Sequence, residues 1–190
     1  FKKRNMKKKN SIVKKKIHNS ILEKLKNKKI LKKFNDFKKS LNVNYKLAFA
    51  VSGGPDSLAL AFLGKCFSLI NQSESKFYLV NHKLRSDSTK EAKLVVSKLK
   101  IINAKCKILT WRGKKPSSNI QSIARKNRYS LLLKQCKKDK ITHLVLGHQI
   151  EDLYENFLIR LLRGSGLKGL TSFGITSEYD EDKPIILRPL

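Results

Sequence analysis

Short apolar runs alternate with longer amphipathic stretches from about residue 46 onward. The apolar runs, each bounded by turn-forming residues, cover 47–51, 77–81, 106–111 and 143–147. Continuous apolar runs of this length are typical of strands that are buried on both faces, as in parallel sheets. Stretches with helical spacing follow them, at 56–70, 87–102, 118–137 and 150–163. The alternation predicts an α/β fold, an open parallel sheet with helices on both faces.

Residues 1–45 have a different pattern from the rest of the chain. They are rich in lysine, and their apolar residues recur at loosely helical spacing, at Ile17, Ile21, Leu22, Leu25 and Leu31. This pattern predicts a basic amphipathic lead-in, helical or partly disordered, before a single domain at 46–190.

Chemically reactive residues follow three of the four apolar runs. "SGGPDS" comes after the first run, "NHKLRSDS" after the second and "GHQIED" after the fourth. Ligands of open α/β sheets bind at the carboxyl ends of the strands. We therefore expect these segments to meet at one edge of the sheet and to form a binding site there.

The segment "SGGPDS" suits a phosphate or pyrophosphate. Gly53 and Gly54 can adopt positive φ and let a ligand approach the backbone, and successive N–H groups in such a turn hold anions. A helix that starts near Asp56 or Ser57 adds its positive dipole end, while Ser52 and Ser57 offer hydroxyl donors. The segment matches neither the G-x-x-x-x-G-K-[ST] loop nor the G-x-G-x-x-G fingerprint.

Asp56 stands inside this predicted phosphate site. A phosphate repels a carboxylate unless a cation lies between them, so the sequence implies Mg²⁺ at Asp56. The alternative is that Asp56 caps the N-terminus of the helix, as Asp often does.

The stretch "GHQIEDLYENFLIRLLRGSG" predicts an acidic helix face. At 100° per residue, His148, Glu151, Asp152 and Glu155 fall within a sector of about 100°. Carboxylates this close repel one another unless a metal or a cationic substrate joins them. The alternative is an exposed acidic first turn, which the helix dipole favours.

The stretch "SSNIQSIARKNRY" predicts a helix with a basic face. It opens with a capping-box pattern from Ser118 to Gln121, and its wheel separates a face with Gln121, Arg125 and Arg128 from a buried face with Ile120, Ala124 and Leu131. Two arginines on one face suit phosphate contact, although a plain surface helix has the same pattern.

"RGSG", which begins at Arg163, is either a further phosphate loop or a helix C-cap. His82 at the ligand edge is either a binding or a structural residue.

The chain carries 43 Lys and Arg residues against 14 Asp and Glu, a formal charge of +29. Such an excess favours a polyanionic partner such as nucleic acid, although a lysine-rich compositional bias contributes, since only eight of these residues are arginine. The three cysteines, Cys66, Cys106 and Cys136, lie far apart, which argues against a disulfide framework, a zinc site or an iron–sulfur site. Without an apolar run of about 18 residues or a signal peptide, we expect a cytoplasmic protein without a membrane anchor.

Taken together, the segments resemble a known family. "SGGPDS" resembles the S-G-G-x-D-S pyrophosphate loop of the ATP pyrophosphatase, or PP-loop, superfamily. Its order and spacing with four further segments are similar to the catalytic domain of tRNA(Ile)-lysidine synthetase over residues 47–190; these segments are "VNHKLRSDS", "NIQSIARKNRY", "LGHQIEDLYENFLIRLLRGSGLKGL" and "LRPL". The resemblance implies the Rossmann-like adenine nucleotide alpha hydrolase fold, with further C-terminal tRNA-binding domains expected beyond this chain.

This chain departs from the family pattern at several positions. The family's V-D-H-G-L-R reads V-N-H-K-L-R here, with Asn81 and Lys83. The acidic helix, usually H-H-x-D-D-Q-x-E-T, keeps three residues, His148, Asp152 and Glu155. It differs at four others, Gln149, Glu151, Leu153 and Asn156.

The resemblance implies a two-step ligation on a tRNA(Ile) with a CAU anticodon. ATP would adenylate the C2 oxygen of the wobble cytidine and release pyrophosphate, and the amine of free L-lysine would then displace AMP to form lysidine. The implied catalytic residues are Asp56, Asp152, Glu155 and Arg125. The implied ATP site comprises Ser52, Gly53, Gly54, Pro55, Asp56, Ser57 and His82, with Mg²⁺ at Asp56, and the implied substrate contacts are His148, Glu151, Arg128 and Arg163.

Two other functions remain open. A PP-loop tRNA thiolase would also adenylate a base, but would need reactive cysteines or cluster ligands near the loop. A non-catalytic RNA-binding relative would explain the substitutions around the acidic helix. The sequence leaves the oligomeric state undetermined.

Overall fold

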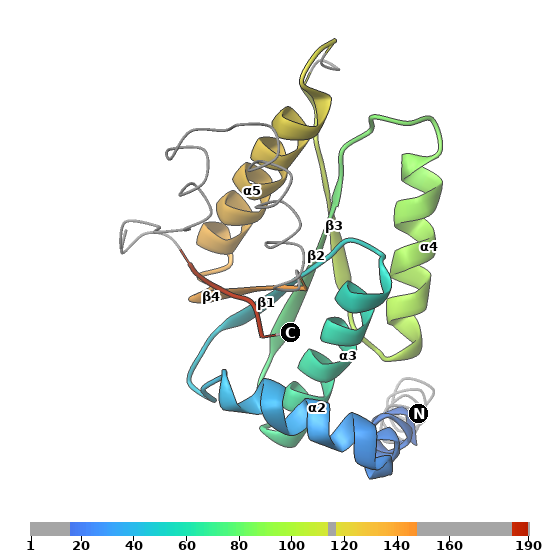
Figure 1. Cartoon of the computed structure of the whole chain (residues 1–190), viewed down its shortest axis with the longest axis vertical. Coiled ribbons are helices and arrows are strands. Elements are labelled where there is room, and N and C mark those ends of the chain that lie inside the picture. The colour runs from blue at the N-terminus through green and yellow to red at the C-terminus, as the bar shows by residue number, and fades with distance from the viewer. Residues whose placement is uncertain (1–15, 114–116, 148–183, 190) are drawn as a thin grey trace, which may run out of the picture.

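Five parallel strands form the sheet at the centre of the molecule (Figure 1). The computed structural model describes residues 16–113, 117–147 and 184–189. The strands are β1 (Leu47–Val51), β2 (Ser75–Asn81), β3 (Cys106–Thr110), β4 (His143–Leu146) and β5 (Ile185–Leu187), in the order β3-β2-β1-β4-β5. Every neighbouring pair is parallel. The predicted α/β fold and its first four strands are confirmed; β5 was not predicted.

The helices between the strands also match the prediction. They are α3 (Pro55–Ile70), α4 (Ser88–Ile101) and α5 (Ile120–Lys138), and α2 (Lys28–Lys39) precedes the sheet with the short 3₁₀ turn η1 (Lys24–Lys26). Residues 16–23 are helical as well. No helix in the described ranges is apolar enough over a sufficient length to cross a membrane. The helix predicted at 150–163 lies outside the described residues.

Side chains alternate between two cores, one on each face of the sheet. Leu47, Phe49 and Val51 of β1 pack with α2, α3 and α4 on one face. Ala48 faces the other core, where Leu132 and Cys136 of α5 lie. A strand buried on both faces needs apolar residues at every position, which explains why these runs lack polar alternation.

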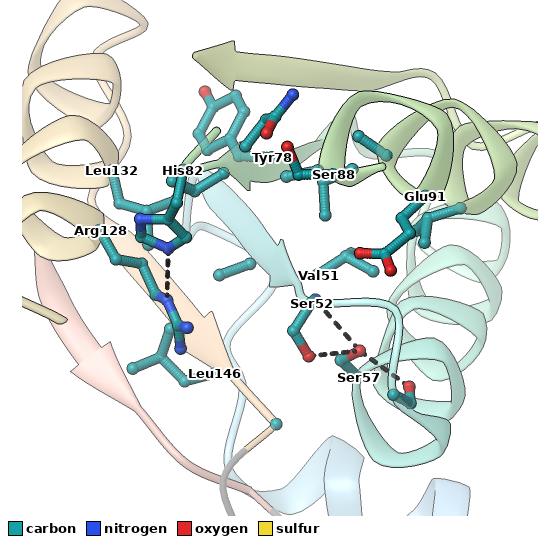
Figure 2. A pocket seen from close by; sticks show the side chains of 18 of the residues that line it. Val51, Ser52, Ser57, Tyr78, His82, Ser88, Glu91, Arg128, Leu132 and Leu146 are labelled. Carbon is teal, nitrogen blue, oxygen red and sulfur yellow. Dashed lines mark hydrogen bonds between the residues drawn. The ribbon is translucent and has the colours of Figure 1, made fainter. Parts of the chain in front are cut away.

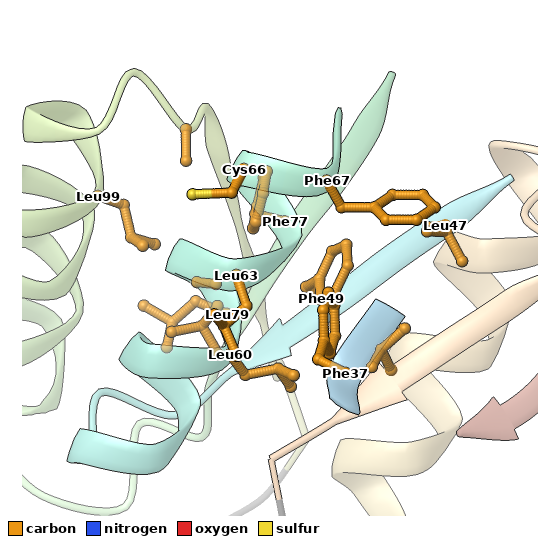
Figure 3. Packing of buried hydrophobic residues seen from close by; sticks show 14 of the residues in the cluster. Phe37, Leu47, Phe49, Leu60, Leu63, Cys66, Phe67, Phe77, Leu79 and Leu99 are labelled. Atoms are coloured by element: carbon orange, nitrogen blue, oxygen red, sulfur yellow. The ribbon is translucent and has the colours of Figure 1, made fainter. Parts of the chain in front are cut away.

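An aromatic cluster joins α2 and α3 to the first face (Figure 3). Phe37 of α2 packs 6.3 Å from Phe49, between ring centroids, and edge-on against Phe67 of α3. A Cβ at Gly64 would lie 2.4 Å from the Phe49 ring, so the glycine lets α3 approach the strand closely. We expect a larger residue at this position to push helix and sheet apart.

The lysine-rich segment before β1 packs on this core over its described part. Ile21, Phe34 and Phe37 are buried, while Leu31, which the helical pattern grouped with the apolar face, is 40% exposed. Asn27 caps α2 by accepting from the backbone N–H of Lys29 at 3.0 Å. The predicted domain boundary between residues 45 and 46 remains a prediction. Residues on both sides of it, among them Phe37 and Leu47, belong to one hydrophobic cluster.

Two expectations about α5 are wrong. The N-cap residue is Asn119 in a left-handed conformation, at φ 48°, and no side chain caps the helix, so the capping box from Ser118 to Gln121 does not form. Ile120, expected on the buried face, is 41% exposed, because the first turn of α5 extends beyond the sheet. Leu131 does pack against the core.

The later strands of the sheet lie on both sides of β1. β2 and β3 follow β1 on one side, and β4 and β5 lie on the other. In open α/β sheets such a switch point is where ligands bind, at the carboxyl ends of the strands. The glycine loop leaves β1 at this point.

Candidate functional site

A cavity of about 430 Å³ opens at the carboxyl ends of β1, β2 and β4 (Figure 2). The loop after β1 and the start of α3 line one side, α4 a second and α5 a third. Its lining combines the residues predicted after the first two apolar runs with apolar side chains from the strands and α5, among them Val51, Leu132 and Leu146. The expected meeting of strand-end segments is therefore observed for the described residues.

The glycine loop has the backbone shape that its sequence predicts. Gly53 has a φ of 96°, and a Cβ there would lie 2.6 Å from Cγ2 of Val95 on α4. Only glycine combines this φ with such close packing. Gly54 is the N-cap of α3 and Pro55 occupies its first turn, where a missing N–H costs nothing.

Asp56 is not the helix cap that one reading of the sequence suggested. Since Gly54 is the N-cap, Asp56 lies within the first turn of α3. Asp56 also lines the cavity. There it is close to the positive end of the helix dipole. The carboxylate is left available for a ligand.

The Ser57 hydroxyl holds the loop together from inside. Its oxygen accepts from the backbone N–H of Ser52 at 3.2 Å and of Gly53 at 3.1 Å, and from the Ser52 hydroxyl at 3.2 Å. It donates to the Gly54 carbonyl at 2.9 Å. Ser52 and Ser57 were expected to donate to a phosphate; in the structure the proton of each hydroxyl is used within the loop.

The end of β4 packs directly against this loop. A Cβ at Gly147 would lie 3.1 Å from Cα of Ser57 and 3.2 Å from its backbone nitrogen. Gly147 thus lets the strand end lie against the first turn of α3. The close contact fixes the position of the loop relative to two strands at once.

Two carboxylates border the cavity from different helices. Asp56 comes from α3 and Glu91 from α4, and Figure 2 shows the Glu91 carboxylate directed toward the cavity. Neither forms an ion pair with another described residue. No group of three potential metal ligands exists within the described ranges. Sequence reasoning missed Glu91, because nothing in the spacing of α4 distinguishes it from an ordinary surface glutamate.

A basic wall lies opposite, where His82 and Arg128 meet. Nε of Arg128 donates to Nε2 of His82 at 3.4 Å, so two segments 46 residues apart form one surface. Burial, and secondarily the charge of Arg128, lowers the pKa of His82. Its ring is therefore neutral near pH 7, and its role as an acceptor from Arg128 fixes the proton on Nδ1.

Two buried polar atoms in this wall have no hydrogen-bond partner among the described residues. They are Nδ1 of His82 and the hydroxyl of Tyr129, and both residues line the cavity. A buried polar group without a partner is costly. Within the described residues, the hydrogen bonding of this wall is therefore incomplete.

Arg125 and Arg128 differ in their position relative to the cavity. Its guanidinium lies 5.6 Å from the centroid of the Tyr129 ring, and it does not line the cavity. Of the two arginines predicted on one helix face, Arg128 lines the cavity and Arg125 does not. Five predicted residues lie outside the described residues: His148, Glu151, Asp152, Glu155 and Arg163.

The three cysteines take no part in the described site. Cys66 and Cys136 are fully buried on opposite faces of the sheet, and none of the three lines the cavity. Burial raises the pKa of Cys66 and Cys106 to about 11 and that of Cys136 to about 12. Thiols with such pKa values are poor nucleophiles near neutral pH.

Several curated proteins are similar to this chain. A tRNA(Ile)-lysidine synthase of Orientia tsutsugamushi is 46% identical over 147 residues, which cover 77% of this chain and 33% of that protein. One of Wolbachia sp. subsp. Brugia malayi is 42% identical over 77% of this chain and 34% of its own length. This chain spans about a third of the length of these relatives.

A solved structure is similar in fold. The U34-tRNA thiolase of Methanococcus maripaludis, with its [4Fe-4S] cluster, superposes with a TM-score of 0.69 at 21% identity, over 85% of this chain and 59% of that one. The family model described as a PP-loop domain matches residues 23–190. With its parallel sheet and its glycine loop at the switch point, the chain belongs to the PP-loop domain family.

Proposed function

We propose that this chain binds ATP in the cavity and is the catalytic part of a tRNA(Ile)-lysidine synthase. Its product would be lysidine at the wobble cytidine of a CAU-anticodon tRNA(Ile), formed with free L-lysine in the cytoplasm. The main support is the Ser52–Ser57 loop, which leaves the central strand at the switch point and borders a cavity with a basic wall opposite. The similarity to named synthases supports the choice of reaction.

The loop would hold the phosphates of ATP. The N–H groups in the first turn of α3 have no acceptor within the helix, as at every helix N-terminus, and the helix dipole favours an anion there. The Ser57 hydroxyl keeps the loop shaped before any ligand arrives. Arg128 borders the same cavity and would neutralise charge on the phosphates.

The wall between β2 and α5 would hold the base and sugar. Apolar side chains such as Leu132 and Leu146 line this side, which suits the flat faces of a purine. His82 and Tyr129 border this side and are proposed to contact the nucleoside, since Nδ1 of the first and the hydroxyl of the second have no partner among the described residues. The cavity would thus hold the phosphates on its α3 side and the nucleoside on its α5 side.

Magnesium fits the acidic side of the cavity. Mg²⁺ is usually bound by one or two carboxylates together with substrate phosphates, and Asp56 and Glu91 are the described carboxylates that line the cavity. When bound, the ion would offset the charge that develops on the leaving pyrophosphate. Asp56 is the closer of the two to the loop in sequence and is the proposed ligand.

In the proposed reaction the cytosine C2 oxygen attacks the α-phosphorus of ATP, and pyrophosphate leaves. The lysine amine then attacks C2, and AMP leaves. Asp152 and Glu155 are proposed to receive the lysine ammonium and to assist its deprotonation, with His148, Glu151 and Arg163 as neighbouring substrate contacts. The charge of +29 would attract tRNA, with an affinity that falls as salt rises.

Labelled lysine tests this proposal directly. The chain is incubated with tRNA(Ile) bearing a CAU anticodon, ATP and Mg²⁺, and incorporation of lysine into RNA is measured. We expect incorporation that is lost, by at least about a hundredfold, in Asp56→Ala and Asp152→Ala. Retention of RNA without transfer of lysine would instead identify a non-catalytic binder.

Replacement of the three cysteines separates the synthase from a thiolase. Because Cys66, Cys106 and Cys136 do not line the cavity, the triple serine variant should still transfer lysine, provided that thermal unfolding shows it folded. A thiolase would lose its activity in the same variant. Sulfur transfer to the tRNA by the wild-type chain would contradict the proposal.

A further inference from the structure

A second cavity, of about 440 Å³, borders the first at the ends of β2 and β3. Its lining comes from two loops that follow neighbouring strands and consists of His82, Lys83, Trp111, Arg112 and Gly113. His82 lines both cavities, so they share a wall. A ligand in the first cavity would therefore have the second one directly beside it.

Trp111 is held in a fixed place in this second cavity. Its backbone N–H donates to the Asn81 carbonyl at 3.0 Å, which extends the pairing of β2 and β3 by one residue. A Cβ at Gly113 would lie 2.6 Å from Nε1 of the indole and 2.7 Å from Cε2. The glycine backbone therefore lies against the ring, which remains half-buried beside the cavity.

Two cations flank the indole. Lys83 and Arg112 are exposed, and neither forms an ion pair within the described part of the chain. The backbone of Lys83 is fixed in the left-handed region, at φ 51°, by a bond of 3.0 Å from its N–H to Oδ1 of Asn81. A flat aromatic ring between unpaired cations is the combination that binds single-stranded nucleic acid, since bases stack on the ring and phosphates pair with the cations.

We propose that Trp111, with Lys83 and Arg112, is a stacking platform for one base of single-stranded RNA. On the proposed function, this base would be a neighbour of the cytidine that reacts in the first cavity. Bases of an anticodon loop are not paired, so one can enter the reaction cavity while the next lies on the indole. The wall shared through His82 sets the two positions one beside the other.

The indole itself reports on this proposal, because Trp111 is the single tryptophan of the 190-residue sequence. Its fluorescence is measured while an anticodon stem–loop RNA with a CAU loop is added, and then while a fully paired RNA duplex of equal length is added. We expect quenching that saturates with the stem–loop and is absent with the duplex and with ATP alone. Binding of the stem–loop, seen by filter retention, without quenching would overturn the platform.

Variants separate stacking from charge. Trp111→Ala should weaken binding of the stem–loop about tenfold, whereas Trp111→Phe keeps an aromatic face and should lose little. Arg112→Ala should also weaken binding and should lower its salt dependence, with quenching at saturation retained. Lys38→Ala is the matched control, since it removes an exposed cation from α2, at the opposite end of the molecule (Figure 1).

These readouts are independent of the reaction. Quenching by RNA without any lysine transfer would support the platform and contradict the proposed synthase activity. Lysine transfer by Trp111→Ala, with unchanged affinity for the stem–loop and a folded domain, would contradict the platform and support the activity.

Discussion

The two sides of the cavity beside the glycine loop satisfy their polar atoms in different ways. On the α3 side, the Ser57 hydroxyl bonds with Ser52, Gly53 and Gly54, so the loop is complete within itself. On the α5 side, Nδ1 of His82 and the hydroxyl of Tyr129 have no partner among the described residues. The first side therefore satisfies its polar atoms within the loop, while the hydrogen bonding of the second is incomplete within the described residues.

The largest expected effect comes from the α3 side. Gly53→Ala combines a strained φ of 96° with a contact of 2.6 Å to Val95, and should lower the free energy of unfolding by about 2–4 kcal/mol. Val95→Ala in the same chain should restore part of this loss. Gly54→Ala is the control, because its Cβ would meet nothing nearer than 3.8 Å. Equal stability of the two alanine variants, measured by urea unfolding, would show that the loop is not shaped as described.

The two tyrosines that line the cavity test the contrast at single hydroxyls. Tyr78 is bonded, since its hydroxyl donates to the Asp139 carboxylate at 2.6 Å, and this bond is the main reason for the lowered pKa of Asp139. Tyr78→Phe should cost about 1.5–3 kcal/mol of stability and should leave ATP affinity unchanged. Tyr129→Phe should not lower stability, since it removes a buried hydroxyl that has no partner among the described residues, and it should weaken ATP binding up to about tenfold. The opposite assignment of the two effects, from chemical unfolding and calorimetry, would reverse our account of the two sides.

The smallest expected effect is a pH dependence on the α5 side. The pKa of His82 is lowered in the folded state from 6.5, so the unfolded chain takes up the proton first as the pH falls. The free energy of unfolding should therefore decrease as the pH drops below about 6.5. His82→Gln should flatten this decrease only in part, because burial also lowers the pKa of His143. An unchanged slope in the variant would place His82 in a more hydrated setting.

The sequence predicted the strands well, because strands buried on both faces leave an unbroken apolar run. The runs at 47–51 and 143–147 could be recognised as strands from their apolar residues alone. β5 was missed because Ile185–Leu187 is three residues long and, among the described strands, pairs with β4 alone. In the lysine-rich segment, Phe34 and Phe37 were overlooked, since their burial depends on α3 and the sheet.

At the site, the sequence predicted which segments meet but not how each side chain is used. The glycine loop, Asp56 and His82 were found from their positions after strands. Sequence reasoning could not predict that Ser57 would turn inward, or that Arg125 would lie over Tyr129, because both depend on side-chain packing. Glu91, Tyr129 and Trp111 gave no signal of their own and were identified from the cavities that they line.

The pairing of β1 on both of its edges has a consequence for dynamics. It bonds with β2 along its length and with β4 along nearly all of it, so its amide hydrogens should exchange with solvent only when the whole domain unfolds. The loop that starts at Ser52 is thus anchored to a strand that is paired on both edges. We therefore expect the loop to stay in place on the timescale on which the surrounding helices and loops move.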